Sequence, residues 1–198
     1  MRLHPLLGTG ILALGLALPL PLAAQETTPP AEPRQPQLGE PYVVAEHQDW
    51  EILCTRFAED GPEMCEMYQL LLGEDGNPLA EISVAILPEG EEFEVGATVT
   101  APLETFLLPG MAWQIGDEGD LREEPFQVCN QIGCIALLGL EEDEVEAMRL
   151  GSHAFVLFRP FAAPDQVVGA RVSLMGFTAA LADLRDREPM PVEAPAAD

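Results

Sequence analysis

The chain has 198 residues, of which 34 are acidic and only nine are basic, and all of the basic residues are arginine. Its formal net charge of −25 repels nucleic acid and anionic lipid head groups, which excludes functions that need a basic binding surface. The same charge attracts cationic partners or divalent ions, but the preferred interpretation is a solvated surface that favours solubility or suits a salty habitat.

The first 24 residues have the layout of a secretory signal peptide. Arg2 is followed by an apolar run over residues 6–22 and then by Ala23 and Ala24. The alternative, a membrane anchor, is disfavoured because two prolines end the run and no basic cluster follows it. No later segment has the ~18 consecutive apolar residues of a transmembrane helix. We therefore predict export to the periplasm or the cell surface, with cleavage after Ala24.

Two flanking segments are too polar and too rich in proline to form a core. Residues 25–40 and 188–198 bury too little apolar surface to offset the entropy of ordering, which predicts a disordered leader and a disordered acidic tail. Between them, residues 41–187 are long enough for one domain with a single hydrophobic core.

The first two cysteines fit opposite positions of a β-hairpin. Residues 49–57 alternate apolar and polar side chains, residues 58–62 have turn chemistry, and residues 63–72 read as the returning strand. With this turn, Cys54 and Cys65 lie about five residues from its centre on either side. Directly opposed strand residues have Cβ atoms ~4.5–5.5 Å apart, which is close to disulfide range.

The other two cysteines flank a shorter turn in the same way. Cys129 and Cys134 border the four-residue loop 130–133, between apolar strands at 126–129 and 134–137. Four cysteines allow three pairings, and this geometry favours the two local ones, each stabilising the domain by very roughly 2–3 kcal/mol. A zinc site is the alternative, but the chain has no C-x-x-C motif and its cysteine spacings are not those of zinc fingers.

The remaining elements predict a β-sandwich or barrel with two helices. Short apolar segments separated by turns indicate further strands at 79–87, 92–98, 105–108, 111–115, 153–158 and 166–173. A helix over 141–150 is indicated by acids at its start, Arg149 near its end and Gly151 after it. A second helix over 176–187 has one apolar stripe, formed by Phe177, Ala180, Leu181 and Leu184.

Groups suited to catalysis are few. After export two histidines remain: His47, expected to be exposed ahead of the first strand, and His153, expected to be structural at the start of a strand. Ser83, Ser152 and Ser173 lie in or beside strands, and none is in a G-x-S-x-G motif. No phosphate-binding glycine motif is present. We predict no catalytic residues, no cofactor and no metal.

Acidic groups leave two alternatives open. Turns at 75–77 and 116–120 resemble oxygen-rich calcium loops, although neither matches an EF-hand and ordinary acidic turns explain both. Acids near Trp113 or Asp117 offer a carboxylate pair for hydrolysis. In so acidic a chain, pairs of carboxylates occur throughout, so a pair does not by itself indicate a hydrolase. A cation-binding module and a hydrolase are therefore kept as alternatives to a binding or structural protein.

Several short motifs occur in an order that resembles the invasion-associated locus B family of exported alphaproteobacterial proteins. The similarity covers residues 49–184. Its motifs are D-W-x-x-x-C from Asp49, C-x-x-x-Q from Cys65 to Gln69, P-G at 109–110, C-x-x-x-G-C from Cys129, and S-L-x-G-F-x-x-A-L from Ser173.

The resemblance implies an immunoglobulin-like β-sandwich with a short C-terminal helix, in the periplasm or on the outer surface, and in pathogenic relatives a link to host-cell entry. It implies no catalytic residues, and its partner is an unknown protein or envelope component. Unlike the family pattern, this chain has no lysine, which argues against a basic binding surface. The resemblance also implies that several recurring positions are structural. Besides the four cysteines, these are Trp50, Gly110, Gly133, Gly176 and Phe177.

Overall fold

The computed structural model describes residues 36–73 and 75–187. The predicted signal peptide at 1–24, the leader up to residue 35 and the tail from residue 188 lie outside the described residues. Within the described ranges, no helix combines the length and the apolar character needed to cross a membrane.

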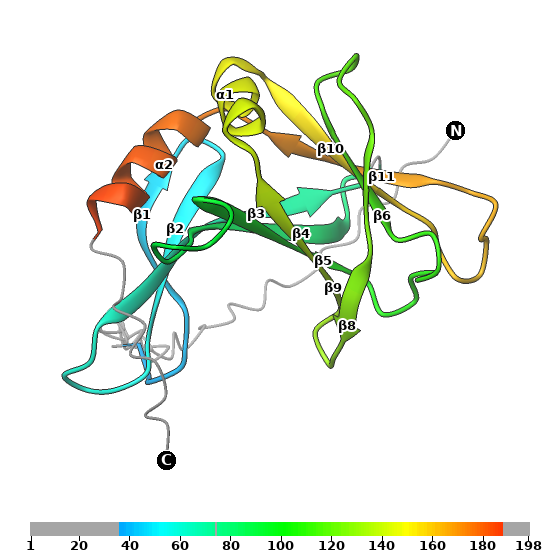
Figure 1. Ribbon diagram of the computed structural model, residues 1–198. Coiled ribbons are helices and arrows are strands. Elements are labelled where there is room, and N and C mark those ends of the chain that lie inside the picture. The colour runs from blue at the N-terminus through cyan, green and yellow to red at the C-terminus, as the bar shows by residue number, and fades with distance from the viewer. Residues whose placement is uncertain (1–35, 74, 188–198) are drawn as a thin grey trace, which may run out of the picture. The chain divides into compact units, whose positions relative to one another are not determined.

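In the part of the chain that the structure describes, eleven strands form two antiparallel sheets (Figure 1). The larger sheet has the order β1-β2-β3-β4-β5-β9-β8 and the smaller one β11-β10-β6-β7. The larger sheet consists of β1 Tyr42–His47, β2 Trp50–Arg56, β3 Glu63–Leu72, β4 Pro78–Ile86, β5 Val95–Ala101, β9 Cys134–Leu140 and β8 Phe126–Cys129. The smaller sheet consists of β11 Val168–Ser173, β10 His153–Phe158, β6 Met111–Ile115 and β7 Arg122–Glu124.

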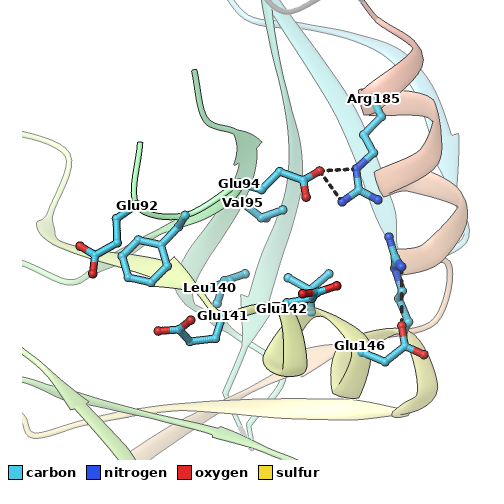
Figure 2. A pocket seen from close by; sticks show the side chains of 11 residues that line it. Glu92, Glu94, Val95, Leu140, Glu141, Glu142, Glu146 and Arg185 are labelled. Atoms are coloured by element: carbon cyan, nitrogen blue, oxygen red, sulfur yellow. Dashed lines mark hydrogen bonds and ion pairs between the residues drawn. The ribbon is translucent and has the colours of Figure 1, made fainter. Parts of the chain in front are cut away.

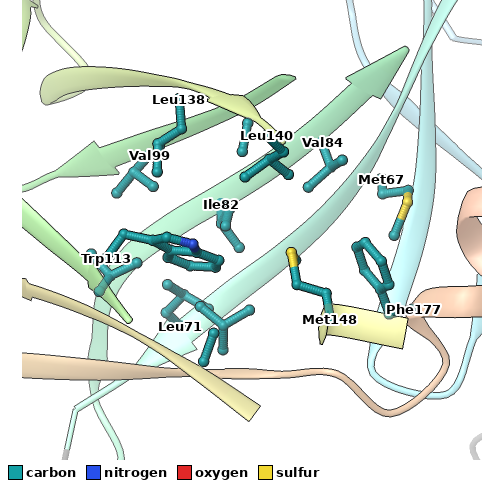
Figure 3. Packing of buried hydrophobic residues seen from close by; sticks show 14 of the residues in the cluster. Met67, Leu71, Ile82, Val84, Val99, Trp113, Leu138, Leu140, Met148 and Phe177 are labelled. Atoms are coloured by element: carbon teal, nitrogen blue, oxygen red, sulfur yellow. The ribbon is translucent and has the colours of Figure 1, made fainter. Parts of the chain in front are cut away.

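Alternation along the strands builds the hydrophobic core. In β2, β5 and β9 every second side chain is buried, as expected where one face of a sheet packs on the core. The inward faces of both sheets and of both helices join in one apolar cluster, in which Trp113, Met148 and Phe177 are fully buried (Figure 3). At roughly 25 cal/mol per Å² of buried apolar surface, this cluster is the main source of stability.

Two helices complete the domain. In α1, Glu142–Leu150, the first turn is acidic and the backbone N–H of Glu141 donates to the Glu144 carboxylate at 3.0 Å. The helix ends at Gly151, whose N–H donates to the Ala147 carbonyl at 2.8 Å. The second helix, α2, Phe177–Asp186, lies beside β1 and β2 in Figure 1 and also contacts β3.

The predicted fold class is confirmed. The chain is mainly β, with two antiparallel sheets, a C-terminal helix and two local disulfides. Both helices begin and end within a residue of their predicted bounds, and all four residues of the predicted apolar stripe of α2 are buried.

Some predicted elements were wrong. Residues 105–108 form no strand: the N–H of Thr105 turns back to the Pro102 carbonyl, and only an isolated bridge joins Thr105 to Pro160. Strand β5 begins at Val95 rather than at residue 92. The prediction also missed β1, whose alternation is interrupted by a bulge, and β7, which has three charged residues and no apolar pattern.

Candidate functional site

Gln69 on β3 ties the start of β2 to the end of β11. Its side-chain amide donates to the Asp49 carbonyl at 3.0 Å and to the Ser173 carbonyl at 3.1 Å. Its Oε1 accepts the N–H of Ser173 at 2.8 Å, and the indole N–H of Trp50 donates to the Ser173 carbonyl at 2.9 Å. Only 8% of Gln69 is exposed, so these hydrogen bonds form where water cannot replace them.

Helix α2 starts directly beside this hydrogen-bonded group. Gly176, its N-cap, has φ of 91°, and a Cβ built there lies 1.9 Å from the His47 carbonyl oxygen. The next residue, Phe177, packs edge-on against Trp50 with ring centroids 5.7 Å apart. This group, the C-terminal junction, consists of Asp49, Trp50, Gln69, Ser173, Gly176 and Phe177.

A hydrogen bond between His47 and Asp183 holds the second half of α2 on β1. His47 Nε2 lies 2.7 Å from Asp183 Oδ2, and the Arg187 side chain donates to the same carboxylate at 2.9 and 3.2 Å. The hydrogen bond from His47, supported by the charge of Arg187, lowers the pKa of Asp183. The expectation that His47 is exposed was wrong, because it ends strand β1 and is half-buried under the helix.

Replacing Asp183 by asparagine is expected to destabilise the domain by about 1 kcal/mol at neutral pH. The folded-state pKa of Asp183 lies below the unfolded value of 3.8, so the charged carboxylate adds stability that is present above pH 3.8 and is lost as the pH falls through the folded value. The difference between the parent and the variant, measured by urea unfolding, should therefore shrink below pH 3.8.

Asp186→Asn, at an exposed position of the same helix, is the control and should have little effect at any pH. A loss in Asp183→Asn that is equally large in acid would mean that the carboxylate charge is not what holds α2.

Both disulfides have the predicted pairing. Cys54 is bonded to Cys65 and Cys129 to Cys134, and each pair occupies directly opposed positions of neighbouring antiparallel strands. The sulfurs of the first pair lie within 4.8 Å of a Glu63 carboxylate oxygen. Because these sulfurs are bonded to each other, the group does not offer thiolate ligands to a metal.

Two predicted structural glycines lie where another backbone approaches closely. A Cβ built on Gly110 lies 2.3 Å from the Glu124 carbonyl oxygen, where the turn before β6 meets β7. One built on Gly133 lies 2.5 Å from the Ala101 carbonyl oxygen, where the β8–β9 loop meets the end of β5. Neither position accepts a larger residue without moving a strand.

A cavity of about 750 Å³ opens between the β4–β5 loop and the two helices (Figure 2). Its floor is apolar and includes Val95 and Leu140. Arg185 reaches Glu94 across it at 2.7 Å, so part of the acidic rim is neutralised within the domain. The other lining residues are Glu92, Phe93, Glu141, Glu142, Val145, Glu146 and Arg149. Arg149 pairs with Glu146 at 3.6 Å, so among the described residues the carboxylates of the lining without a salt bridge are those of Glu92, Glu141 and Glu142.

Sequence analysis did not foresee that Ser152, His153 and Asp117 meet. Ser152 Oγ lies 3.0 Å from His153 Nδ1, and His153 Nε2 lies 3.0 Å from Asp117 Oδ1. The Asp117 side chain is 79% exposed, and Ser152 is exposed. The nearby N–H groups of Gly116 and Leu174 already donate to the carbonyls of His153 and Ser152, so they do not form an oxyanion hole. The contacts fasten the turn after β6 to β10.

Two acids in the region of Trp113, Glu124 and Glu144, are engaged in ion pairs with Arg122. Arg122 donates to Glu124 at 2.6 Å and to Glu144 at 2.7 Å, which links β7 to α1. The calcium-like turn at 75–77 is closed internally, because the Asp75 carboxylate accepts the side-chain and backbone N–H groups of Asn77 at 2.7 and 3.1 Å. These hydrogen bonds lower the pKa of Asp75.

The fold and the junction define a small, disulfide-bonded domain of two antiparallel sheets closed by a C-terminal helix. The family model described as invasion associated locus B (IalB) protein matches residues 50–185. The chain belongs to this family.

A solved structure supports the same fold. The crystal structure of invasion associated protein B from Bartonella henselae superposes with a TM-score of 0.57 at 21% sequence identity, covering 73% of this chain and 97% of that chain. Among curated proteins, none matches the sequence.

Proposed function

We propose that this chain is exported and acts in the periplasm or at the cell surface as a non-catalytic binding or structural module of the invasion-associated locus B type. The proposal is supported by the structural contacts that the motif residues form. Trp50 and Gln69 both donate to the Ser173 carbonyl, and no residue of the C-terminal junction lines the acidic cavity. The residues that carry the family resemblance thus stabilise the fold, and no catalytic group is found among them.

The cysteines support the extracytoplasmic location. All four are oxidised in local pairs, a state that persists in the periplasm and outside the cell and is rare in the cytosol. Removal of residues 1–24 takes away Arg2 and leaves 8 − 34 = −26 formal charges. A partner that binds by electrostatic attraction is therefore cationic.

Fractionation of cells that express the full chain tests the export. We expect the chain in the extracytoplasmic fraction, beginning at Gln25, with the two local disulfides found by peptide mapping without reduction. A control with arginine at Leu14 and Leu16 interrupts the apolar run and should stay in the cytoplasm with reduced thiols. An intact N-terminus and four free thiols in the parent chain would contradict the proposal.

A cation-binding module is the second candidate, favoured by the carboxylates around the cavity (Figure 2). Calorimetry with calcium separates the two: no heat and no shift in melting temperature at millimolar ion excludes this candidate. The hydrolase alternative is tested with Ser152→Ala and Asp117→Asn. Turnover of an ester or glycoside that is abolished in either variant, with the fold intact, would contradict the non-catalytic proposal.

A further inference from the structure

The β8–β9 hairpin is chemically unlike the rest of this acidic chain. From Phe126 to Leu140 the sequence contains no charged residue, although the chain has 34 acids. Three of its large apolar side chains are exposed, and at the loop Ile132 is 74% exposed. The other two are Val128 and Leu137. The hairpin therefore presents an uncharged, apolar surface to which an anionic group can approach without strong repulsion.

The hairpin also carries the more accessible of the two disulfides. Strand β8 is the last strand of the larger sheet, so one side of its backbone has no strand partner there. Cys129 on β8 is exposed, whereas its partner Cys134 on β9 is fully buried. An approaching thiolate thus meets one sulfur of this bond directly, from the open side of the sheet.

The disulfide between β2 and β3 has the opposite environment. Strand β2 lies between β1 and β3, and β3 lies between β2 and β4, so neither is at the edge of the sheet. Cys54 is fully buried. The Glu63 carboxylate lies within 4.8 Å of both sulfurs. This carboxylate is paired with Arg56 at 3.3 Å, so its charge is largely compensated, and burial and the flanking strands are what limit access to this disulfide. The two disulfides of one chain therefore differ in strand position and exposure.

We propose that the Cys129–Cys134 disulfide is a thiol–disulfide exchange site for a dithiol oxidoreductase, which docks on the free edge of β8. An extended segment of the oxidoreductase adds to this edge through backbone hydrogen bonds, and the exposed apolar side chains of the hairpin contact it. The inference rests on the proposed export, since an exchanging disulfide needs an oxidising compartment in which to re-form.

The exchange balances in two steps. A thiolate of the oxidoreductase attacks Cys129 Sγ, forming a mixed disulfide and releasing Cys134 as a thiolate that takes a proton from water. The second thiol of the oxidoreductase, as its thiolate, then attacks its own sulfur in the mixed disulfide and releases Cys129, which is also protonated. The chain's disulfide is reduced to two thiols and the dithiol of the oxidoreductase becomes a disulfide.

Burial of Cys134 makes it a poor leaving group while the hairpin is closed. Strand β8 has only four residues, and a register irregularity between Phe126 and Val128 weakens its pairing with β9. Opening of this short edge strand hydrates Cys134, so release of the thiolate accompanies local opening rather than global unfolding.

Graded reduction of the oxidised chain tests the inference. The chain is incubated with dithiothreitol, quenched by alkylation and mapped by mass spectrometry. We expect Cys129–Cys134 to be reduced at least about tenfold faster than Cys54–Cys65. A dithiol oxidoreductase of the C-x-x-C type, with its second cysteine replaced by serine, should be trapped in a mixed disulfide on Cys129. Faster reduction of Cys54–Cys65, or no trapped product on Cys129, would overturn the inference.

A pair of charge variants tests the role of the uncharged surface. Ile132→Glu places an anion beside the disulfide and should slow both reactions several-fold. Leu150→Glu, at an 81% exposed position at the end of α1, should leave the rates unchanged. Equal rates in the two variants would contradict docking at the hairpin. Because these experiments use purified oxidised protein, they can fail while the fractionation experiment still supports export.

Discussion

Replacing Gly176 by alanine is expected to lower the free energy of unfolding by at least about 3 kcal/mol and to detach α2 from the sheet. At φ of 91° an alanine is strained by roughly 1 kcal/mol even where space is free. Here the added Cβ also overlaps the His47 carbonyl oxygen, at 1.9 Å, so the helix start and β1 must move apart. Urea unfolding measures the loss, and hydrogen exchange of the α2 amides shows whether the helix has separated.

Gly90→Ala is the matched control. Gly90 has nearly the same backbone conformation, with φ of 97°, but no atom lies within 4 Å of its added Cβ. It should therefore lose only about 1 kcal/mol, the effect of the backbone conformation alone. Equal losses in the two variants would show that α2 does not depend on the close approach of Gly176 to His47.

Replacing Gln69 by leucine is expected to cost about 3 kcal/mol of unfolding free energy. Leucine is of similar size, so the change removes hydrogen bonds with little change in packed volume. The N–H of Ser173 then loses its partner in the junction and the Asp49 carbonyl loses a donor, at a cost of about 1–3 kcal/mol for each group left unpaired, whereas the Ser173 carbonyl keeps the indole N–H of Trp50. Thermal and urea unfolding measure the effect.

Gln127→Leu, at an exposed position on β8, serves as the control for Gln69→Leu. It should change stability by no more than about 0.5 kcal/mol, as is usual for a surface substitution. If Gln69→Leu were equally mild, the hydrogen bonds of Gln69 would contribute little beyond those that its partners form with water in the unfolded chain.

The disulfides could be predicted because their geometry is local. Turn residues midway between Cys54 and Cys65, and the short loop between Cys129 and Cys134, fix which positions oppose each other. The apolar stripe of α2 was equally readable, since helical periodicity depends on the segment alone.

The C-terminal junction could not be predicted as a site. Gln69 and Ser173 are 104 residues apart in the chain, and His47 and Asp183 are 136 apart. Sequence patterns mark these residues only through the motifs of the family resemblance, which give no contacts. Their meeting depends on how β11 and α2 pack on the larger sheet, and this is set by the whole core rather than by local spacing.

One useful signal was present and was missed. The uncharged run from Phe126 to Leu140 is visible in a chain where acids are otherwise frequent, and it marks the hairpin that differs chemically from its surroundings. No comparable sequence pattern indicates that Ser152, His153 and Asp117 lie together, because Asp117 is part of an ordinary acidic turn.

The residues behind the family resemblance are expected to form one cooperative structural junction. A double-mutant cycle of Gln69→Leu and Gly176→Ala, followed by urea unfolding, measures this cooperativity. Gln69 bonds Asp49 and Ser173, and Gly176 lies against His47, so the two changes loosen adjoining contacts of one group. The double variant should therefore lose less than the sum of the single losses, by at least about 1 kcal/mol. Losses that add to within about 0.5 kcal/mol would contradict a shared junction.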